Sequence, residues 1–248
     1  MQSDIMDISG VPVLVTGGGK RIGKACVEAL AQSHASVVIH YGSSKKEAEF
    51  LLTKIRKEGG KAAMVQGDLA NPDEVGSIMQ QAGQFFGPVQ ILLNSAAIFK
   101  PGLFKNTDLT QWHEHLNINL TAPFILMQEF AAQLPPKTPG KIINIIDQRI
   151  KRPRPGHIAY NTAKSGLWTL TQIAAQEMAP WIQVNAIAPG PILPAPDQPV
   201  ASFEKVAKAT PLGRPGSTDD IAQAVIFLIK QEYTTGEIIR VDGGEHLQ

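Results

Sequence analysis

Tyr160 and Lys164 are the two residues whose types and spacing most directly suggest chemistry. They are four positions apart, and residues at that spacing lie on the same face of a helix. Because a nearby ammonium favours the phenolate, we expect Lys164 to lower the pKa of Tyr160 and make it a usable proton donor near neutral pH. Tyr41 and Lys45 share this spacing, but Tyr41 ends an expected strand, whereas Tyr160 begins an expected helix. The pattern therefore predicts proton transfer at Tyr160.

A glycine-rich turn at residues 16–23, Thr-Gly-Gly-Gly-Lys-Arg-Ile-Gly, follows the first expected strand and opens the first expected helix. Glycines allow a tight turn and a close approach of the backbone, so that the free N–H groups of the helix N-terminus can face a pyrophosphate. The alternative is an ordinary strand-to-helix turn. The placement of the turn favours nucleotide binding.

The end of the second expected strand indicates which nucleotide binds, because an acidic residue there would hold a ribose 2′-hydroxyl. No Asp or Glu occurs between Glu28 and Glu47. Hydroxyl and ammonium groups stand there instead, on Tyr41, Ser43, Ser44 and Lys45. Arg21 in the glycine turn adds a cation. These groups suit a 2′-phosphate and predict NADPH over NADH; the alternative is a serine helix cap with solvated lysines.

Short apolar runs rich in β-branched residues predict seven strands, at residues 11–16, 35–40, 61–66, 90–94, 141–146, 182–187 and 237–241. Amphipathic segments between them predict helices at residues 20–32, 45–57, 73–86, 111–133, 160–178 and 218–229. Alternating strands and helices with near-continuously apolar strands are typical of a parallel sheet covered on both faces. We therefore expect an α/β protein, a single doubly wound (Rossmann) domain over residues 1–248 with a seven-stranded parallel sheet.

One irregular insertion interrupts this alternation between Pro189 and about Thr210. It contains five prolines, at positions 189, 191, 194, 196 and 199. Since proline removes a backbone donor and restricts its neighbours, we expect no regular structure here. Such an insertion usually covers a site, so residues 189–210 are predicted to be a substrate loop.

Composition excludes several classes of function. The 248 residues carry a formal charge of +1, which provides no basic field for nucleic acid or anionic lipid. Cys26 is the single cysteine and cannot form an internal disulfide or a cysteine-based zinc site, and the six histidines lack metal-ligand spacing. Without an apolar leader in Met1–Gly10 or an uncharged membrane-length run, the sequence predicts a cytoplasmic protein with no metal.

From about Val11 to Leu247 the chain resembles the short-chain dehydrogenase/reductase family. The resemblance rests on the glycine turn, Asp68-Leu69, the run Asn94-Ser95-Ala96-Ala97, Asn119, Tyr160 with Lys164, Pro189-Gly190 and Val241-Asp242-Gly243-Gly244. It implies that Lys164 holds the nicotinamide ribose, that Tyr160 gives or takes the proton, and that Asn119 supports a water relay to Lys164. It also implies a homotetramer. The cofactor-binding residues that we predict are Gly17, Lys20, Arg21, Ile22, Gly23, Tyr41, Ser43, Ser44, Lys45, Asp68, Leu69, Asn94, Ala96, Tyr160, Lys164, Pro189, Gly190 and Ile192.

Two departures from the family pattern resemble its pteridine reductase branch. Arg21 replaces an expected glycine, and Asp147 replaces the serine expected thirteen residues before Tyr160. In that branch the arginine lies near the cofactor phosphates and the pterin, and the aspartate pairs with the tyrosine as a proton-donating dyad. The resemblance thus implies hydride transfer from NADPH to a C=N bond of a dihydropterin or dihydrofolate-type substrate, with Asp147, Tyr160, Lys164 and Asn119 as catalytic residues.

An aromatic residue in this branch stacks on the pterin a few positions after the fourth-strand asparagine. Here Ile98 stands at the aligned position and Phe99 follows it. We therefore predict Arg21, Phe99, Asp147 and Tyr160 as substrate-binding residues. Two alternatives remain open: a general carbonyl reductase acting on ketoacyl or sugar substrates, which a serine at 147 would have favoured, and a non-catalytic NADPH-binding sensor, against which Tyr160 and Lys164 argue.

A basic loop, with Arg149, Lys151, Arg152 and Arg154 and no acid among residues 148–156, lies between Asp147 and Tyr160. Such a run is usually solvated. Our hypothesis is that it attracts the glutamate carboxylates of folate-type substrates.

Overall fold

The seven expected strands form one parallel sheet in a computed structural model that describes residues 7–195 and 198–248. The strands are β1 (Pro12–Val15), β2 (Ser36–Tyr41), β3 (Lys61–Gln66), β4 (Ile91–Asn94), β5 (Gly140–Ile145), β6 (Ile182–Pro189) and β7 (Ile238–Val241). Their order is β3-β2-β1-β4-β5-β6-β7, and every neighbouring pair is parallel. This confirms the predicted single doubly wound α/β domain.

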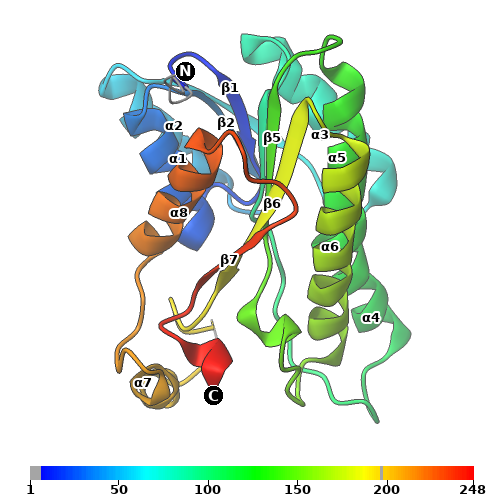
Figure 1. The fold of residues 1–248 in the computed structure, drawn as a ribbon, viewed down its shortest axis with the longest axis vertical. Helices are drawn as coiled ribbons and strands as arrows, with labels where there is room; N and C mark the ends of the chain where they lie inside the picture. The colour runs from blue at the N-terminus through cyan, green and yellow to red at the C-terminus, as the bar shows by residue number, and fades with distance from the viewer. Residues whose placement is uncertain (1–6, 196–197) are drawn as a thin grey trace.

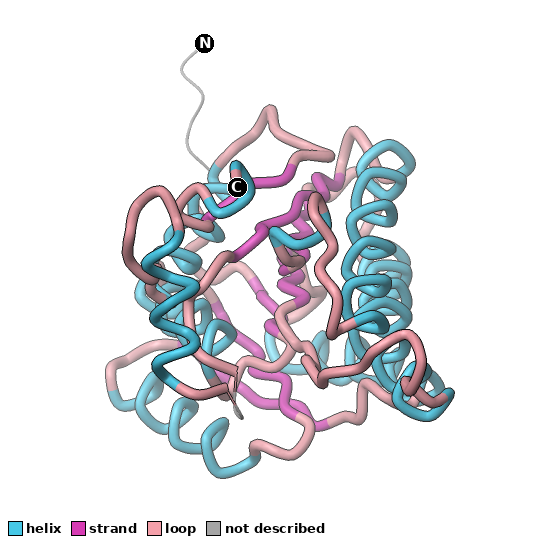
Figure 2. Tube along the Cα trace, turned by 90° about the horizontal axis from the view of Figure 1, so that it is seen from below, coloured by secondary structure: helices cyan, strands magenta, loops and turns pink. Residues whose placement is uncertain are grey.

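Helices cover both faces of the sheet (Figure 1). The helices are α1 (Arg21–Gln32), α2 (Lys45–Lys57), α3 (Pro72–Phe86), α4 (Leu109–Leu116), α5 (Ala122–Gln133), α6 (Ile158–Glu177), α7 (Val200–Ala209) and α8 (Thr218–Lys230). Helices α1, α2 and α8 lie on one face, and α3, α5 and α6 lie on the other. The view from below shows the strands running between these two layers (Figure 2).

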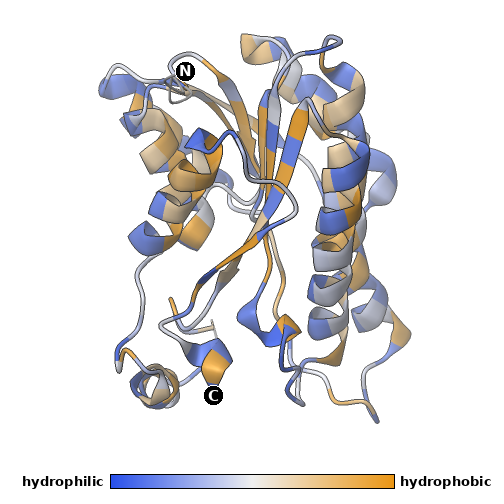
Figure 3. Ribbon diagram, viewed as in Figure 1, coloured by the Kyte–Doolittle hydropathy of each residue, from blue (hydrophilic) through white to orange (hydrophobic). Residues whose placement is uncertain are grey.

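Alternating side chains along each strand build the two halves of the core. Val13 and Val15 of β1 belong to the apolar cluster under α1, α2 and α8, whereas Leu14 between them belongs to the cluster under α3, α5 and α6. All three are fully buried. Successive strand residues point to opposite faces, so a strand covered on both faces must be apolar throughout. The strands accordingly form much of the hydrophobic centre of the molecule (Figure 3).

The chain reverses its winding direction at β1, which pairs with β2 on one side and β4 on the other. In open α/β sheets ligands bind in the crevice at the carboxyl ends of the strands beside such a reversal. The glycine turn follows β1, and Asn94 ends β4. The fold thus brings two predicted binding segments to one crevice.

The helix predicted over residues 111–133 is divided. A π-helical turn, Asn117–Thr121, separates α4 from α5, and the N–H of Ala122 donates to the carbonyl of Asn117, five residues back. Pro123 explains the interruption, because its nitrogen carries no hydrogen and cannot donate to the carbonyl of Asn119, four residues back. The turn therefore places Asn119 at an irregular point of the backbone.

The prediction that residues 189–210 lack regular structure is wrong. Strand β6 continues to Pro189, and the second half of the insertion forms α7. The prolines cluster before this helix, Pro199 is its N-cap, and residues 200–209 contain none. The predicted loop position 196 lies outside the described residues. The prolines thus prevent regular secondary structure only in the first half of the insertion.

Candidate functional site

Close backbone packing shapes the glycine turn after β1. Gly17 has a φ of +62°, and a Cβ added there would lie 3.0 Å from Ala96 Cα. A Cβ on Gly23 would lie 2.3 Å from the carbonyl oxygen of Gly17. Both positions therefore require glycine, and Ile22 lies between them at the start of α1. This turn leaves the N-terminus of α1 at the crevice, an arrangement that fits a nucleotide pyrophosphate.

Arg21 extends from this turn to the insertion after β6. It has a φ of +51°, in the left-handed region that side chains rarely adopt. Its Nη2 donates to the carbonyl of Pro194 over 2.8 Å. Ile192 is buried nearby in sequence, while Gly190 N donates to Val241 O over 3.0 Å. Arg21 thus links the insertion to the glycine turn.

His40, which was not predicted as a site residue from the sequence, binds the backbone of the glycine turn. Its Nδ1 accepts from Gly17 N over 3.2 Å, and its Nε2 lies 3.1 Å from the carbonyl of Gly67. Since Nδ1 accepts, Nε2 must carry the proton and donate, so the ring is neutral. Burial lowers the pKa of His40 to about 4. The imidazole therefore links β2, the glycine turn and the end of β3 in one protonation state.

Lysines and glutamates lie together beyond the end of β2. A Cβ on Gly19 would lie 3.1 Å from Ser44 Oγ, which places this hydroxyl against the glycine turn. Lys20 pairs with Glu47 at 2.7 Å, and Lys45 lies 3.8 Å from Glu49. The groove beside them is lined by Gly19, Lys20, Arg21, Lys24, Lys46, Glu47 and Phe50. Ser44 occupies the N-cap of α2 without a side-chain capping bond, so its hydroxyl is not committed to the helix.

The residues around that groove differ in burial. Tyr41 is buried and its hydroxyl lies 3.5 Å from Gln66 Oε1, whereas Ser43 is exposed. After β3, Asp68 is exposed and Leu69 is buried. The exposed polar residues are thus the ones free to meet a ligand at this edge.

The end of β4 is held to its neighbours by side chains. Thr16 Oγ1 accepts from the N–H groups of Ser95 and Ala96, each over 3.0 Å. Asn94 Nδ2 donates to Asn144 Oδ1 over 2.8 Å, while Asn94 Oδ1 is buried and has no partner within the described part of the chain. An unpaired buried acceptor is costly and is commonly explained by a missing ligand or water. The Asn94 side chain thus joins β4 to β5 near the carboxyl ends of these strands.

Three predicted catalytic residues meet at the start of α6. The Tyr160 hydroxyl donates to Asp147 Oδ2 over 2.9 Å, and Asp147 Oδ1 accepts from Arg149 N over 2.8 Å. Lys164 Nζ donates to the carbonyl of Ile145 over 2.6 Å and lies 6.0 Å from the centre of the Tyr160 ring. The spacing on α6 and the end of β5 thus assemble a carboxyl, a phenol and an ammonium.

Burial controls the protonation of these three groups. It raises the pKa of Asp147, and the hydrogen bond from Arg149 N opposes this increase. Burial and the Asp147 carboxylate raise the pKa of Tyr160 well above its usual value, and burial lowers the pKa of Lys164 to about 8. The expectation that Lys164 lowers the pKa of Tyr160 is therefore wrong, because burial and the facing carboxylate dominate. Tyr160 keeps its proton at neutral pH, as a donor must.

Phe99, rather than Ile98, is the aromatic residue at this site. Its ring meets Tyr160 edge-on, with centroids 4.7 Å apart and planes at 84°. His157 stacks on it at 4.0 Å and 11°, and Arg149 Cζ lies 5.1 Å from its centroid. Sequence reasoning missed His157; its position three residues before Tyr160, at the N-cap of α6, was the available signal. Burial, Arg149 and His115 lower the pKa of His157.

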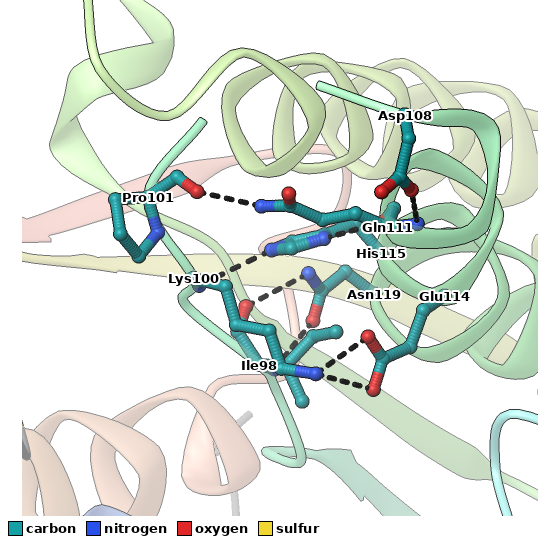
Figure 4. A network of polar contacts seen from close by, with 8 residues as sticks. All are labelled: Ile98, Lys100, Pro101, Asp108, Gln111, Glu114, His115 and Asn119. Atoms are coloured by element: carbon teal, nitrogen blue, oxygen red, sulfur yellow. Dashed lines mark hydrogen bonds and ion pairs between the residues drawn. The ribbon is translucent and has the colours of Figure 1, made fainter. Parts of the chain in front are cut away.

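Asn119 is fully buried beneath the segment that carries Phe99. Its Oδ1 accepts from Ile98 N and its Nδ2 donates to Ile98 O, each over 3.0 Å (Figure 4). The Asn119 side chain is therefore bound to the backbone of Ile98. The backbone carbonyl of Asn119 has no α-helical donor, because Pro123, four residues later, carries no N–H.

The basic loop divides into two parts. Arg149 faces Phe99, whereas Lys151 and Arg152 are exposed and Arg154 lies 3.9 Å from Glu245. Across residues 7–195 and 198–248, no cluster of three His, Cys, Asp or Glu side chains is arranged to hold a metal. Over the same residues, no helix is long and apolar enough to cross a membrane.

Comparison with known proteins identifies the family. A family model described as enoyl-(acyl carrier protein) reductase matches residues 18–246. A 3-oxoacyl-(acyl-carrier-protein) reductase of Synechocystis sp. is 32% identical over 235 residues, covering 93% of this chain and 95% of the relative.

Solved structures resemble the chain over nearly its whole length. The FolM alternative dihydrofolate reductase 1 of Brucella canis, complexed with NADP, has a TM-score of 0.94 and 38% identity, covering 98% of this chain and 96% of that one. A blue fluorescent protein from a metagenomic library, in complex with NADPH, has a TM-score of 0.90 and 33% identity, with coverages of 97% and 99%. Both complexes agree with the predicted cofactor. Together with the matched motifs and the fold, these likenesses establish that this chain belongs to the short-chain dehydrogenase/reductase family.

Proposed function

We propose that this protein is an NADPH-dependent reductase that transfers hydride to a C=N bond of a dihydropterin or dihydrofolate-type substrate. The observation that carries the proposal is the 2.9 Å hydrogen bond between Tyr160 and Asp147. Reduction of a simple carbonyl requires one proton donor of moderate strength. Protonation of a ring nitrogen is helped by a second acidic group that relays a proton to the first donor. The 38% identity to the Brucella canis alternative dihydrofolate reductase 1 supports the same substrate class.

The crevice at the reversal point fits NADPH. The glycine turn would hold the pyrophosphate at the N-terminus of α1, and Arg21, Ser44 and the lysines beside them would meet the 2′-phosphate. Lys164, buried beside Tyr160, would hold the nicotinamide ribose. Bound NADPH supplies the hydride. We assign the cofactor contacts to Gly17, Lys20, Arg21, Ile22, Gly23, Tyr41, Ser43, Ser44, Lys45, Asp68, Leu69, Asn94, Ala96, Tyr160, Lys164, Pro189, Gly190 and Ile192.

The protonation step follows from the dyad. Reduction of a C=N bond adds a hydride to carbon and a proton to nitrogen, and the Tyr160 hydroxyl holds that proton at neutral pH because its pKa is raised. Asp147 has a raised pKa of its own, so the two groups titrate as a coupled pair. After Tyr160 gives up its proton, the pair regains one through Lys164 and water. The backbone carbonyl of Asn119, deprived of a helical donor by Pro123, would bind that water.

The substrate would lie between the dyad and Phe99. The Phe99 ring provides an apolar face for a planar heterocycle, and its edge already touches Tyr160. Arg21 would border the same space from the glycine turn, where its Nη2 donates to the carbonyl of Pro194. Arg149, beside Phe99, would attract the carboxylates of a folate-type tail. Residues 189–210, including α7, would cover the bound substrate.

The second candidate is a general carbonyl reductase, which the 32% identity to the Synechocystis 3-oxoacyl-(acyl-carrier-protein) reductase favours. A charged carboxylate beside the hydride path would hinder binding of a carbonyl substrate, so the presence of Asp147 disfavours the carbonyl reductase function. A non-catalytic NADPH sensor is distinguished from both reductases by the absence of turnover.

The deciding experiment is an NADPH-oxidation assay of the purified protein with dihydropterins, dihydrofolate, quinonoid dihydropterin and 3-ketoacyl thioesters. We expect the highest kcat/KM with a dihydropterin or dihydrofolate. A preference for ketoacyl thioesters would support the carbonyl reductase, and no turnover with any substrate would support the sensor.

We also propose that the protein forms a homotetramer, as its family resemblance implies. Light scattering coupled to gel filtration should give a mass four times that of the 26.7 kDa chain, and a monomer mass would contradict it.

A further inference from the structure

The segment that carries Phe99 is held by three side chains spaced four residues apart along one face of α4 and the π-helical turn (Figure 4). Asn119 makes two hydrogen bonds to the backbone of Ile98, each of 3.0 Å. His115 Nε2 accepts from Lys100 N over 3.2 Å, and Gln111 Nε2 donates to Pro101 O over 2.6 Å. The backbone is thus bound immediately before and immediately after Phe99.

His115 is the central member of this set. It is fully buried, and its Nδ1 lies 2.8 Å from the carbonyl of Gln111, one turn earlier on its own helix. Because Nε2 accepts from Lys100 N, Nδ1 must carry the proton and donate to that carbonyl. The imidazole therefore connects the helix backbone directly to the segment with Phe99, and an aliphatic residue at 115 could make neither bond.

We propose that Gln111, His115 and Asn119 form a positioning ladder that sets the place of the Phe99 ring, with His115 as a specificity-determining positioning residue for planar substrates. Hydrogen bonds on both flanks restrict the backbone dihedrals of Phe99 and so direct its side chain toward Tyr160. A planar ring stacked there would have a defined distance from the Tyr160 hydroxyl. This inference depends on the proposed function only for the chemical identity of the planar substrate.

An exposed ion pair offers a matched control on the same segment. Lys100 Nζ lies 2.6 Å from Glu114 Oε2, and both side chains are at least one-third exposed. Exposed pairs contribute little to stability, and this one binds the side chain of Lys100 rather than the backbone beside Phe99. Glu114→Gln should therefore leave the ring in place.

The test compares His115→Leu, His115→Gln and Glu114→Gln, using a dihydropterin and an aromatic ortho-quinone as planar substrates. We expect His115→Leu to raise the KM for both planar substrates about tenfold, as expected for losing a buried hydrogen bond, while the Kd for NADPH changes less than twofold. His115→Gln, whose side-chain oxygen can accept from Lys100 N, should recover most of the loss. Glu114→Gln should behave as the wild type.

A double-mutant cycle with Phe99→Leu shows whether the ladder acts through the ring. In the Phe99→Leu background, adding His115→Leu should change the KM by less than about twofold. Additive effects, or equal losses in planar-substrate KM and NADPH affinity, would overturn the ladder. If His115→Leu fails to fold, Gln111→Leu removes the Pro101 bond and is judged by the same criteria. An enzyme that reduces the quinone but no dihydropterin would refute the proposed function alone.

Discussion

The Tyr160 hydroxyl donates a 2.9 Å hydrogen bond to Asp147 Oδ2 and thereby joins the start of α6 to the end of β5. Both groups are shielded from water, and burial raises the pKa of each. A hydroxyl that stays protonated can release its proton toward the substrate when negative charge develops there, and the facing carboxyl, whose pKa is also raised, can share that proton. Lys164, whose pKa burial lowers to about 8, lies with its Nζ 6.0 Å from the centre of the Tyr160 ring.

Removing the phenolic oxygen should separate binding from turnover. Tyr160→Phe keeps the ring packed against Phe99 but lacks the proton donor, so kcat should fall by about a hundredfold to ten-thousandfold while the Kd for NADPH stays near the wild-type value. Lys164→Ala should damage both quantities. Steady-state kinetics and fluorescence titration with NADPH measure them. A Tyr160→Phe enzyme that retains most of its kcat would assign proton delivery to another group.

Cofactor preference should follow the charge at the end of β2. NADPH should have the higher kcat/KM, because no carboxylate occurs between Glu28 and Glu47 to hold a ribose 2′-hydroxyl, whereas the hydroxyl and ammonium groups of Ser43, Ser44 and Lys45 suit a 2′-phosphate. Gly42→Asp should move the ratio toward NADH, and a Cβ at Gly42 has room, with its nearest contact at 3.7 Å. Gln81→Glu, on the distant α3, adds the same charge as a control. A wild-type preference for NADH would contradict the assignment.

Arg149 should discriminate between substrates with and without a glutamate tail. Arg149→Gln should raise the KM for dihydrofolate more than the KM for a dihydropterin lacking carboxylates, and the difference should grow at low ionic strength. Lys151→Gln, which changes an exposed side chain of the same loop, should have the smaller effect. Equal increases for both substrates would reject a carboxylate-binding role for Arg149.

Stability should fall in weak acid because of His40. Its pKa is about 4 in the folded protein and near 6.5 in an unfolded chain, so the unfolded state binds more protons between these values. The contribution is complete above about pH 6.5 and is lost as the pH falls toward 4, up to about 3 kcal/mol. Urea unfolding at pH 7.5 and pH 5 should show a smaller pH-dependent loss in His40→Asn than in the wild type. Identical losses would show that His40 does not titrate in this way.

Local pattern was sufficient for the sheet, because apolar runs mark the strands and most of the helices between them are amphipathic. Local pattern was insufficient where one residue changes the backbone structure around another. Pro123 reshapes the helix around Asn119, and the helix after Pro199 begins where the prolines stop. The spacing of Tyr160 and Lys164 predicted that they share a face of α6, but the direction of the Tyr160 pKa shift depends on burial, which spacing does not reveal.

The histidines illustrate the same limit. His40 and His115 are each bonded to backbone groups far away in the sequence, and His157 meets Phe99 across the site. His40 and His115 have no local signature, since a lone histidine has no characteristic spacing, whereas the position of His157 three residues before Tyr160 was an available signal. Phe99 stands one position from the aligned residue, and the structure places its ring edge-on to Tyr160.

The kcat/KM for a dihydropterin divided by that for a 3-ketoacyl thioester, measured with NADPH in the wild type and in Asp147→Ser, tests the central claim most directly. Serine at 147 removes the carboxyl that pairs with Tyr160 but leaves a hydroxyl there. We predict that the ratio falls by about a hundredfold, through loss of dihydropterin reduction with activity on the thioester kept or raised. An unchanged ratio, whether both activities fall together or neither falls, would contradict a proton-donating dyad of Asp147 and Tyr160.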